Sequence, residues 1–219
     1  MDDYAIASLT RANAAIASGA FAAEIVPVTV TTRAGDVIVD TDEAPGKGRP
    51  EKIPTLRAAF AKDGTITAAT SSSISDGAAA VVLTRTSVAE AKGLTPVATL
   101  VGMSGHAQEP QDFTTAPIGA INKLLAQVGW SVADVDLWEV NEAFAAVTMA
   151  AMHEFSLPHE IVNVHGGACA LGHPIGASGA RIALHLALEL KRRGGGVGAA
   201  ALCGGGGQGD ALIIRVPSA

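Results

Sequence analysis

The chain has 219 residues, enough to bury a sizeable core as one large domain or two small ones. Hydrophobic residues make up 48% and charged residues 16%, which indicates a folded globular chain and excludes a disordered one. The net charge of −6 argues against a general nucleic-acid surface, so no nucleic-acid partner is expected.

Cysteine usage and the N-terminal residues predict the compartment. The two cysteines, Cys169 and Cys203, are too few for a disulfide scaffold. The first residues are acidic and amphipathic and do not resemble a secretion signal. No stretch of about 18 uncharged apolar residues is present, so neither a transmembrane helix nor a membrane partner is expected. These features predict a soluble, cytoplasmic protein.

The N-terminal part is predicted to begin with a helix. Asp2 and Asp3 can cap it, Gly19 can end it, and one face carries the apolar residues Ala5, Leu9, Ala12 and Ile16. After this helix the pattern predicts strands over 24–32 and 36–42, a loop over 43–52, a short helix over 53–61, a buried strand over 79–85 and a helix over 86–93.

The C-terminal part alternates predicted strands and helices. A helix beginning at Pro117 is followed by Gly129, and another helix follows Ser178. We also expect a helix over 141–155 and strands over 96–103, 135–140, 160–164, 197–203 and 211–216. This alternation is typical of layered α/β structure.

Two glycine-rich stretches, 163–181 and 203–209, each carry one reactive side chain, His173 and Cys203. Glycine lets the backbone approach a ligand closely, and exposed amide N–H groups in such turns can hold negative charge. A titratable side chain beside such donors indicates chemistry on a carbonyl group, in which one partner stabilises an oxyanion and another moves a proton.

Three motifs stand in order: NEAFA from Asn141 to Ala145, GHPIGASGAR from Gly172 to Arg181, and CGGGG from Cys203 to Gly207. Together they resemble the C-terminal motifs of the thiolases, the acetyl-CoA acetyltransferases. The resemblance runs from Met1 to Ala219 and covers a little over half of a typical family member, its C-terminal part.

The resemblance implies a fold and a domain organisation. Thiolases have a layered αβαβα α/β fold of two similar halves, with a loop domain inserted in the first half. On this pattern residues 1–74 are part of the loop domain, residues 75–93 are the end of the N-terminal half, and residues 94–219 are the C-terminal domain.

The resemblance also implies catalytic roles. His173 corresponds to the histidine that activates a nucleophilic cysteine and donates into an oxyanion hole, which suits an imidazole of near-neutral pKa. Cys203 corresponds to the cysteine that moves a proton at the acetyl α-carbon, although a free cysteine is more often a buried, inert thiol. Gly205 would supply a backbone N–H to a second oxyanion hole.

Asn141 has two alternative roles. As the first residue of a predicted helix it can be an N-cap, and by resemblance it positions a water molecule in the first oxyanion hole. Three further residues are candidate substrate and coenzyme A contacts: Ser72 for the pantetheine arm, with Phe113 and Phe144 lining the pocket. Glu142 is expected to support the site.

Metal sites are not expected. His165, Cys169 and His173 are spaced four apart, but the intervening glycines and Pro174 argue against the helix that would align them on zinc. A potassium site of some relatives includes a tyrosine where Pro45 stands here, so potassium is not carried over. No cofactor is implied, because coenzyme A thioesters are substrates.

The implied reaction interconverts two acetyl-CoA with acetoacetyl-CoA plus coenzyme A, or cleaves a longer 3-ketoacyl-CoA. Neither Cys169 nor Cys203 lies in the family's nucleophile motif, so we expect a truncated chain or one half of a split enzyme. The chain would form a homo-oligomer or pair with an N-terminal thiolase half. The alternative is a non-catalytic remnant that binds coenzyme A or pairs with thiolase subunits.

Overall fold

The computed structural model describes residues 1–218. The strands are β1 (Val28–Thr32), β2 (Gly35–Val39), β3 (Thr99–Ala107), β4 (Leu137–Val140), β5 (Gly196–Gly204) and β6 (Gln208–Val216). The helices are α1 (Asp2–Ser18), α2 (Glu43–Lys47), α3 (Thr86–Ala91), α4 (Ala116–Val128), α5 (Ala145–Glu154), α6 (Ala168–Leu171) and α7 (Ser178–Arg192). Short 3₁₀ helices are η1 (Pro50–Thr55), η2 (Pro110–Thr115), η3 (Val132–Asp134) and η4 (His159–Ile161).

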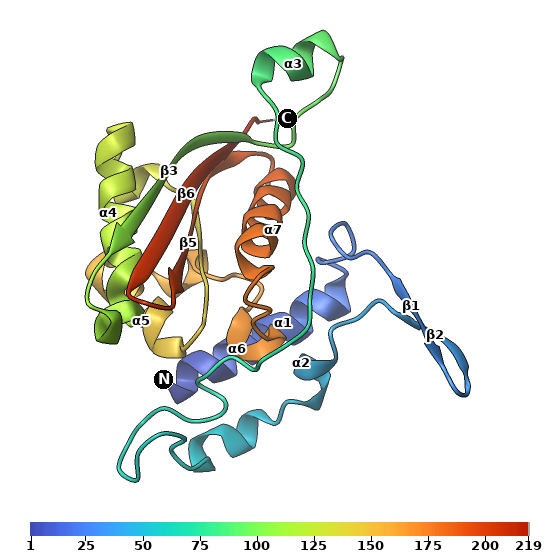
Figure 1. Cartoon of the computed structure of the whole chain (residues 1–219), viewed down its shortest axis with the longest axis vertical. Helices are drawn as coiled ribbons and strands as arrows, with labels where there is room; N and C mark the ends of the chain where they lie inside the picture. The colour runs from blue at the N-terminus through green and yellow to red at the C-terminus, as the bar shows by residue number, and fades with distance from the viewer. Residues whose placement is uncertain (219) are drawn as a thin grey trace.

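A four-stranded sheet in the order β3-β6-β5-β4 forms the centre of the molecule. Strands β5 and β6 are an antiparallel hairpin, and β4 pairs with β5 in parallel. Helices α4 and α5 lie on one side of this sheet and α7 on the other (Figure 1). The layered α/β fold expected from the sequence is confirmed.

Strand alternation builds a core on each side of the sheet. Ala199 and Ile213 face α4, where they join a cluster with Ile121, Leu124 and Trp138. Their sequence neighbours Ala200 and Ile214 face the opposite way and pack with Ile182, Leu186 and Leu190 of α7. Successive strand residues point to opposite faces, so the apolar strands β5 and β6 serve both layers.

Helix α1 is docked on the C-terminal part through its apolar face. Ala5, Leu9 and Ala12 pack with Ile53 and Ala170, and Gly19 ends the helix with a left-handed φ of 72°. The expected helix over the first residues is therefore confirmed, but Met1 is at its N-cap position, and Asp2 and Asp3 lie in its first turn and do not cap it. The two strands expected over 24–32 and 36–42 are present but shorter, as β1 and β2, and this hairpin projects away from the α1 contact and is exposed along its length (Figure 1).

The prediction of a buried strand over 79–85 is wrong. These residues form no helix or strand, and they run as an extended trace toward α3 (Figure 1). Val82 and Leu83 are 96% and 77% exposed. An apolar run becomes a buried strand only where another strand pairs with it, and none does so among the described residues.

Other element predictions need correction. The loop expected over 43–52 contains α2 and the start of η1, and the helix expected over 53–61 is replaced by the end of η1 and irregular chain. The strand expected over 160–164 is the end of the 3₁₀ helix η4 followed by two isolated bridges, Trp138 to Val162 and Val164 to Gly166. Within residues 1–218, no helix combines the length and apolarity needed to cross a membrane.

Candidate active site

Asn141 and His173, which are 32 residues apart, meet at the end of β4. The Asn141 N–H donates to the Ala201 carbonyl at 2.9 Å, which extends the ladder between β4 and β5. The Asn141 Nδ2 lies 3.3 Å from the His173 Nε2. Two motifs that are separate in the sequence therefore share one contact.

The N-cap alternative for Asn141 is wrong. Helix α5 begins at Ala145 with Phe144 at its N-cap position, so the expected helix over 141–155 starts four residues late. The Asn141 Oδ1 is buried and has no hydrogen-bond partner in the part of the chain that the structure describes. A buried acceptor of this kind needs a partner, and a water or ligand donor can provide one.

The hydrogen bonds of His173 define its tautomer. Its Nδ1 lies 2.6 Å from the Ser178 Oγ, and this hydroxyl donates to the Pro174 carbonyl at 3.1 Å. The hydroxyl therefore accepts from an Nδ1–H, which leaves Nε2 with a lone pair facing Asn141. Burial and the nearby Arg181 guanidinium lower the pKa of His173, so the neutral imidazole is favoured.

The serine-rich segment 70–75 connects the two motifs. The N–H and the hydroxyl of Ser72 both donate to the Ala143 carbonyl, at 3.1 and 3.0 Å. The Ser73 carbonyl accepts from the His173 N–H at 3.0 Å. Gly172, with φ of 90°, has no room for a side chain because Ser75 fills that space. This segment fixes the backbone on either side of the Asn141–His173 contact.

Cys203 lies near the end of β5 at the same edge of the sheet as Asn141. Val140 pairs with Ala201, so Cys203 is two residues, about 7 Å, further along β5. The Cys203 thiol is buried among Val140, Val147 and Ala151, and burial raises its pKa. The thiol is therefore the favoured form, as expected for a partly apolar environment.

The turn after Cys203 is open to a ligand at Gly205. Gly205 is exposed and a β-carbon there would meet no atom within 4 Å, whereas Gly206 and Gly207 have positive φ of 84° and 83°. Phe113 and Phe144 pack against the Cys203 cluster, with ring centroids 6.1 Å apart. Phe60, which the sequence analysis missed because no motif marks it, lies 6.0 Å from Phe144.

Glu142 supports the site through buried hydrogen bonds. Its carboxylate accepts from the hydroxyls of Tyr4 and Ser8 at 2.8 and 2.7 Å, from Asn163 at 2.9 Å and from the Cys169 N–H at 3.0 Å. Tyr4 and Ser8 come from α1, so α1 is tied to the residue that follows Asn141. No motif marks either residue, because α1 is recognisable in the sequence only by its apolar periodicity.

The side chains considered for zinc have other partners. His165 lies 3.2 Å from His185, and the Cys169 thiol lies 3.8 Å from the Glu142 carbonyl. His173 is held by Ser178 and Asn141. Across residues 1–218, no group of three or more His, Cys, Asp and Glu side chains is arranged to hold a metal ion.

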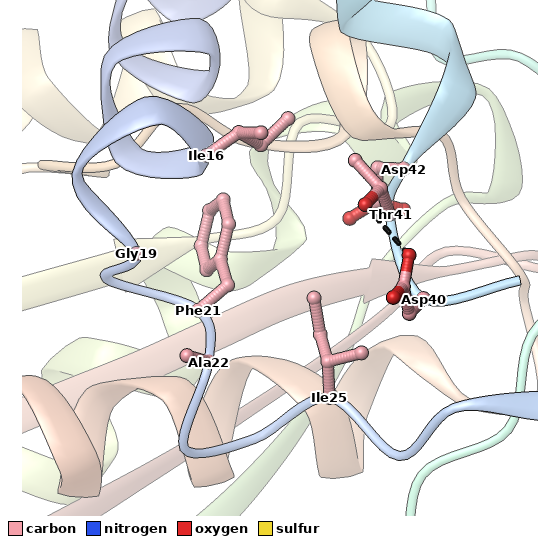
Figure 2. Close-up of a pocket in the computed structure, with 8 residues that line it drawn as sticks. All are labelled: Ile16, Gly19, Phe21, Ala22, Ile25, Asp40, Thr41 and Asp42. Carbon is pink, nitrogen blue, oxygen red and sulfur yellow. Dashed lines mark hydrogen bonds between the residues drawn. The ribbon is translucent and has the colours of Figure 1, made fainter.

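A small cavity of about 120 Å³ lies apart from the Asn141–His173 contact. Ile16, Phe21 and Ile25 line one side of it, and Asp40, Thr41 and Asp42 the other (Figure 2). The Thr41 hydroxyl donates to the Asp40 carboxylate at 3.0 Å. None of the candidate catalytic residues lines this cavity.

Comparison with known families identifies the chain. The family described as thiolase, N-terminal domain, matches residues 1–87, and that described as thiolase, C-terminal domain, matches residues 94–216. The chain belongs to the thiolase family. A relative from Mycobacterium tuberculosis, named probable acetyl-CoA acetyltransferase, is 49% identical over 98% of this chain. An acetyl-CoA acetyltransferase from Paracoccus denitrificans is 46% identical over 99% of it.

Solved thiolase structures share the fold. A crystal structure of the Bacillus anthracis acetyl-CoA acetyltransferase matches 99% of this thiolase chain with a TM-score of 0.95 and 46% identity. The Acat5 thiolase from Ascaris suum, in complex with coenzyme A, matches with a TM-score of 0.87 and 40% identity. The chain spans 55% of each of these two structures and 55–56% of the two curated relatives.

Proposed function

We propose that this chain supplies the C-terminal catalytic residues of an acetyl-CoA C-acetyltransferase. The reaction interconverts two acetyl-CoA with acetoacetyl-CoA plus coenzyme A, and thiolysis of a longer 3-ketoacyl-CoA is the related alternative. The observation that carries the proposal is the Asn141–His173 contact, in which the Nε2 lone pair of His173 faces the Asn141 Nδ2 and the buried Asn141 Oδ1 has no hydrogen-bond partner in residues 1–218.

Each candidate catalytic residue transfers a proton or stabilises a charge in this proposal. The His173 Nε2 lone pair takes the proton of a nucleophilic thiol, and the resulting N–H, with a water held by Asn141, stabilises the oxyanion of the thioester. Burial favours the thiol form of Cys203, so in this proposal Cys203 first gives its proton to the departing coenzyme A thiolate. The resulting Cys203 thiolate takes a proton from the acetyl α-carbon during synthesis, and the thiol returns that proton to the enolate during thiolysis. Gly205 donates its N–H to the oxyanion of the acyl-enzyme.

The proposal places the acyl-carrying thiol outside this chain. Cys169 is a poor nucleophile, because burial and the neighbouring Glu142 carboxylate raise its pKa well above the usual range. Cys203 is also held in the thiol form by burial. General acid–base groups contribute about 10²–10⁴-fold, but they do not replace the atom that carries the acyl group.

A non-catalytic role is the second candidate, and the exposed apolar segment 79–85 favours it. A chain that presents Val82 and Leu83 to solvent is suited to pairing with another thiolase subunit or an N-terminal thiolase half. In that role the chain would bind coenzyme A through Ser72, Phe113 and Phe144 without turnover.

The test is thiolysis of acetoacetyl-CoA, followed by loss of its enolate absorbance. The chain alone is expected to show no turnover, and an N-terminal thiolase half that bears the nucleophilic cysteine should restore it. Cys203→Ser and His173→Asn in the restored enzyme should each lower turnover about 10²–10⁴-fold. Turnover by the chain alone that Cys169→Ser abolishes would contradict the assignment of roles.

The catalytic and the non-catalytic role predict different turnover when the N-terminal half is added. Restored turnover that depends on His173 and Cys203 supports the catalytic role. Binding of the N-terminal half without any turnover, at concentrations where coenzyme A also binds, supports the non-catalytic role.

A further inference from the structure

Gln108 links the turn after Cys203 to the 3₁₀ helix η2. It stands directly after β3, and its N–H donates to the Gly207 carbonyl at 2.9 Å. The two backbones touch so closely that a β-carbon at Gly207 would collide with the Gln108 carbonyl oxygen. The main chain of Gln108 therefore fixes one end of the glycine-rich turn that carries Gly205.

The side chain of Gln108 holds η2. Its Nε2 donates to the Asp112 carbonyl at 2.5 Å and to the Thr115 Oγ1 at 2.8 Å. The Thr115 hydroxyl uses its own hydrogen on the Asp112 carbonyl at 3.0 Å, so it accepts from Gln108. The carboxamide orientation is therefore determined, and its Oε1 faces the Nε2 of His106 at 3.1 Å.

His106 must donate in this contact, because the Gln108 Oε1 only accepts. The imidazole is then the Nε2–H tautomer, and its Nδ1 is buried without a hydrogen-bond partner in residues 1–218. The ring lies against Gly119 of α4, where a β-carbon would collide with it. His106 thus anchors the Gln108 carboxamide to β3 and α4.

Phe113 follows Asp112 directly, so the bonds that hold η2 also place this ring. Phe113 packs against Phe144 and against the cluster that contains Cys203, two residues before Gly205. We propose that Gln108, held by His106, is a positioning residue that sets the spacing between Phe113 and the turn after Cys203. The inference rests on the proposed function, in which Gly205 binds the oxyanion of the acyl-enzyme and Phe113 contacts the substrate.

The first test needs no activity. In the ¹⁵N-labelled chain of 219 residues, Gln108→Met should shift the amide resonances of both Phe113 and Gly205, and it should change the His106 tautomer signature. Gln108→Glu keeps the acceptor for His106 but has no donor for Asp112, so it should shift Phe113 and leave the His106 tautomer unchanged. The matched control is Gln111→Met, at an exposed position of the same 3₁₀ helix, and it should shift the amide resonances of neither Phe113 nor Gly205.

The second test uses the enzyme restored with a nucleophile-bearing N-terminal half. Gln108→Met should raise the KM for acetoacetyl-CoA about tenfold, with kcat changed less than about threefold, because the lost bonds orient the site without touching the reacting atoms. Gln111→Met should match the unchanged chain.

The outcomes separate the two proposals. If the unchanged chain shows no turnover even with the N-terminal half added, that result counts against the proposed function, and the resonance test then still decides the role of Gln108. The positioning role would be overturned if the amide resonances of Phe113 and Gly205 did not shift in the Gln108→Met variant. An unchanged KM of this variant in an active enzyme would overturn it as well.

Discussion

The central sheet and the segment 79–85 are both apolar, yet only the sheet is buried. Ile213 of β6 is 0% exposed and Leu186 of the covering helix α7 is 1% exposed, because α4 and α5 pack on one side of the sheet and α7 on the other. Val82 is 96% exposed on an extended trace that no described strand pairs with (Figure 1). A hydrophobic sequence alone thus does not create a buried core. Segment 79–85 has the apolar composition that is typical of an interaction surface.

The largest difference is expected in the free energy of unfolding that is lost when a side chain is shortened in the packed sheet and helix layers or in segment 79–85. Leu186→Ala should lower the free energy of unfolding by about 2–5 kcal/mol, because it leaves a cavity in a packed layer. Val82→Ala should change it by less than about 0.5 kcal/mol. Urea denaturation measures both, and an equal loss at Val82 would show that this segment is buried in solution.

A second prediction concerns α1, which belongs to the N-terminal part but is tied to Glu142. Tyr4→Phe removes one donor from a buried carboxylate and should lower the free energy of unfolding by about 1–3 kcal/mol. Thr10→Val on the exposed side of α1 is the control and should have little effect. Equal effects of the two changes would mean that α1 is not docked as described.

A third prediction follows from polar groups trapped in the covered region. Burial raises the pKa of Glu139 to about 7, against an ordinary value of 4.5. Between these values the folded chain holds a proton that the unfolded chain has lost, so this group's contribution to stability falls as pH rises. His185, whose pKa is also raised overall by its partners Glu24 and Glu139, contributes in the same direction.

Glu139→Gln should therefore stabilise the chain at pH 8 by roughly 1–3 kcal/mol and have a smaller effect at pH 5. The free energy of unfolding of this variant should also differ less between pH 5 and pH 8 than that of the unchanged chain. Thermal melts at both pH values measure this, and Glu160→Gln on the exposed η4 is the control. A Glu139→Gln variant that is less stable at pH 8 would mean that the carboxylate is charged and well paired there.

The smallest effect on stability is expected for a charge in the exposed segment. Val82→Lys should leave the free energy of unfolding within about 0.5 kcal/mol of the unchanged chain. It should nevertheless reduce self-association, or pairing with an N-terminal half, in sedimentation velocity. Association that is unaffected by Val82→Lys would place the contact surface elsewhere.

The sequence predicted elements well where local signals were sufficient. Helices α1, α4 and α7 carry regular apolar faces, and Gly19 and Gly129 end the first two with left-handed φ. The buried strand over 79–85 failed because burial depends on a partner layer. The helix expected from Asn141 does not begin there, because this part of the chain makes backbone hydrogen bonds with another segment. The Ala143 carbonyl accepts from the Ser72 N–H, and the Thr70 carbonyl accepts from the Ala145 N–H.

The candidate site could be predicted only in part. The motifs identified Asn141, His173 and Cys203, but not the contact between the first two, which the segment 70–75 creates across the chain. Gln108 and His106 belong to no motif, and their roles become visible only through hydrogen bonds that fix an amide and a tautomer. The division of the chain at residues 74 and 93 stays a prediction.

The most direct measurement is exchange of the methyl protons of acetyl-CoA with deuterated solvent, in the enzyme restored with an N-terminal half. In the proposed mechanism Cys203 moves this proton, and His173, protonated at Nε2 by the nucleophilic thiol, holds the enolate oxygen together with the water bound to Asn141. Exchange well above the buffer rate, lowered about 10²–10⁴-fold by Cys203→Ser, is the predicted result. Equal exchange with and without the Cys203 thiol would contradict the account.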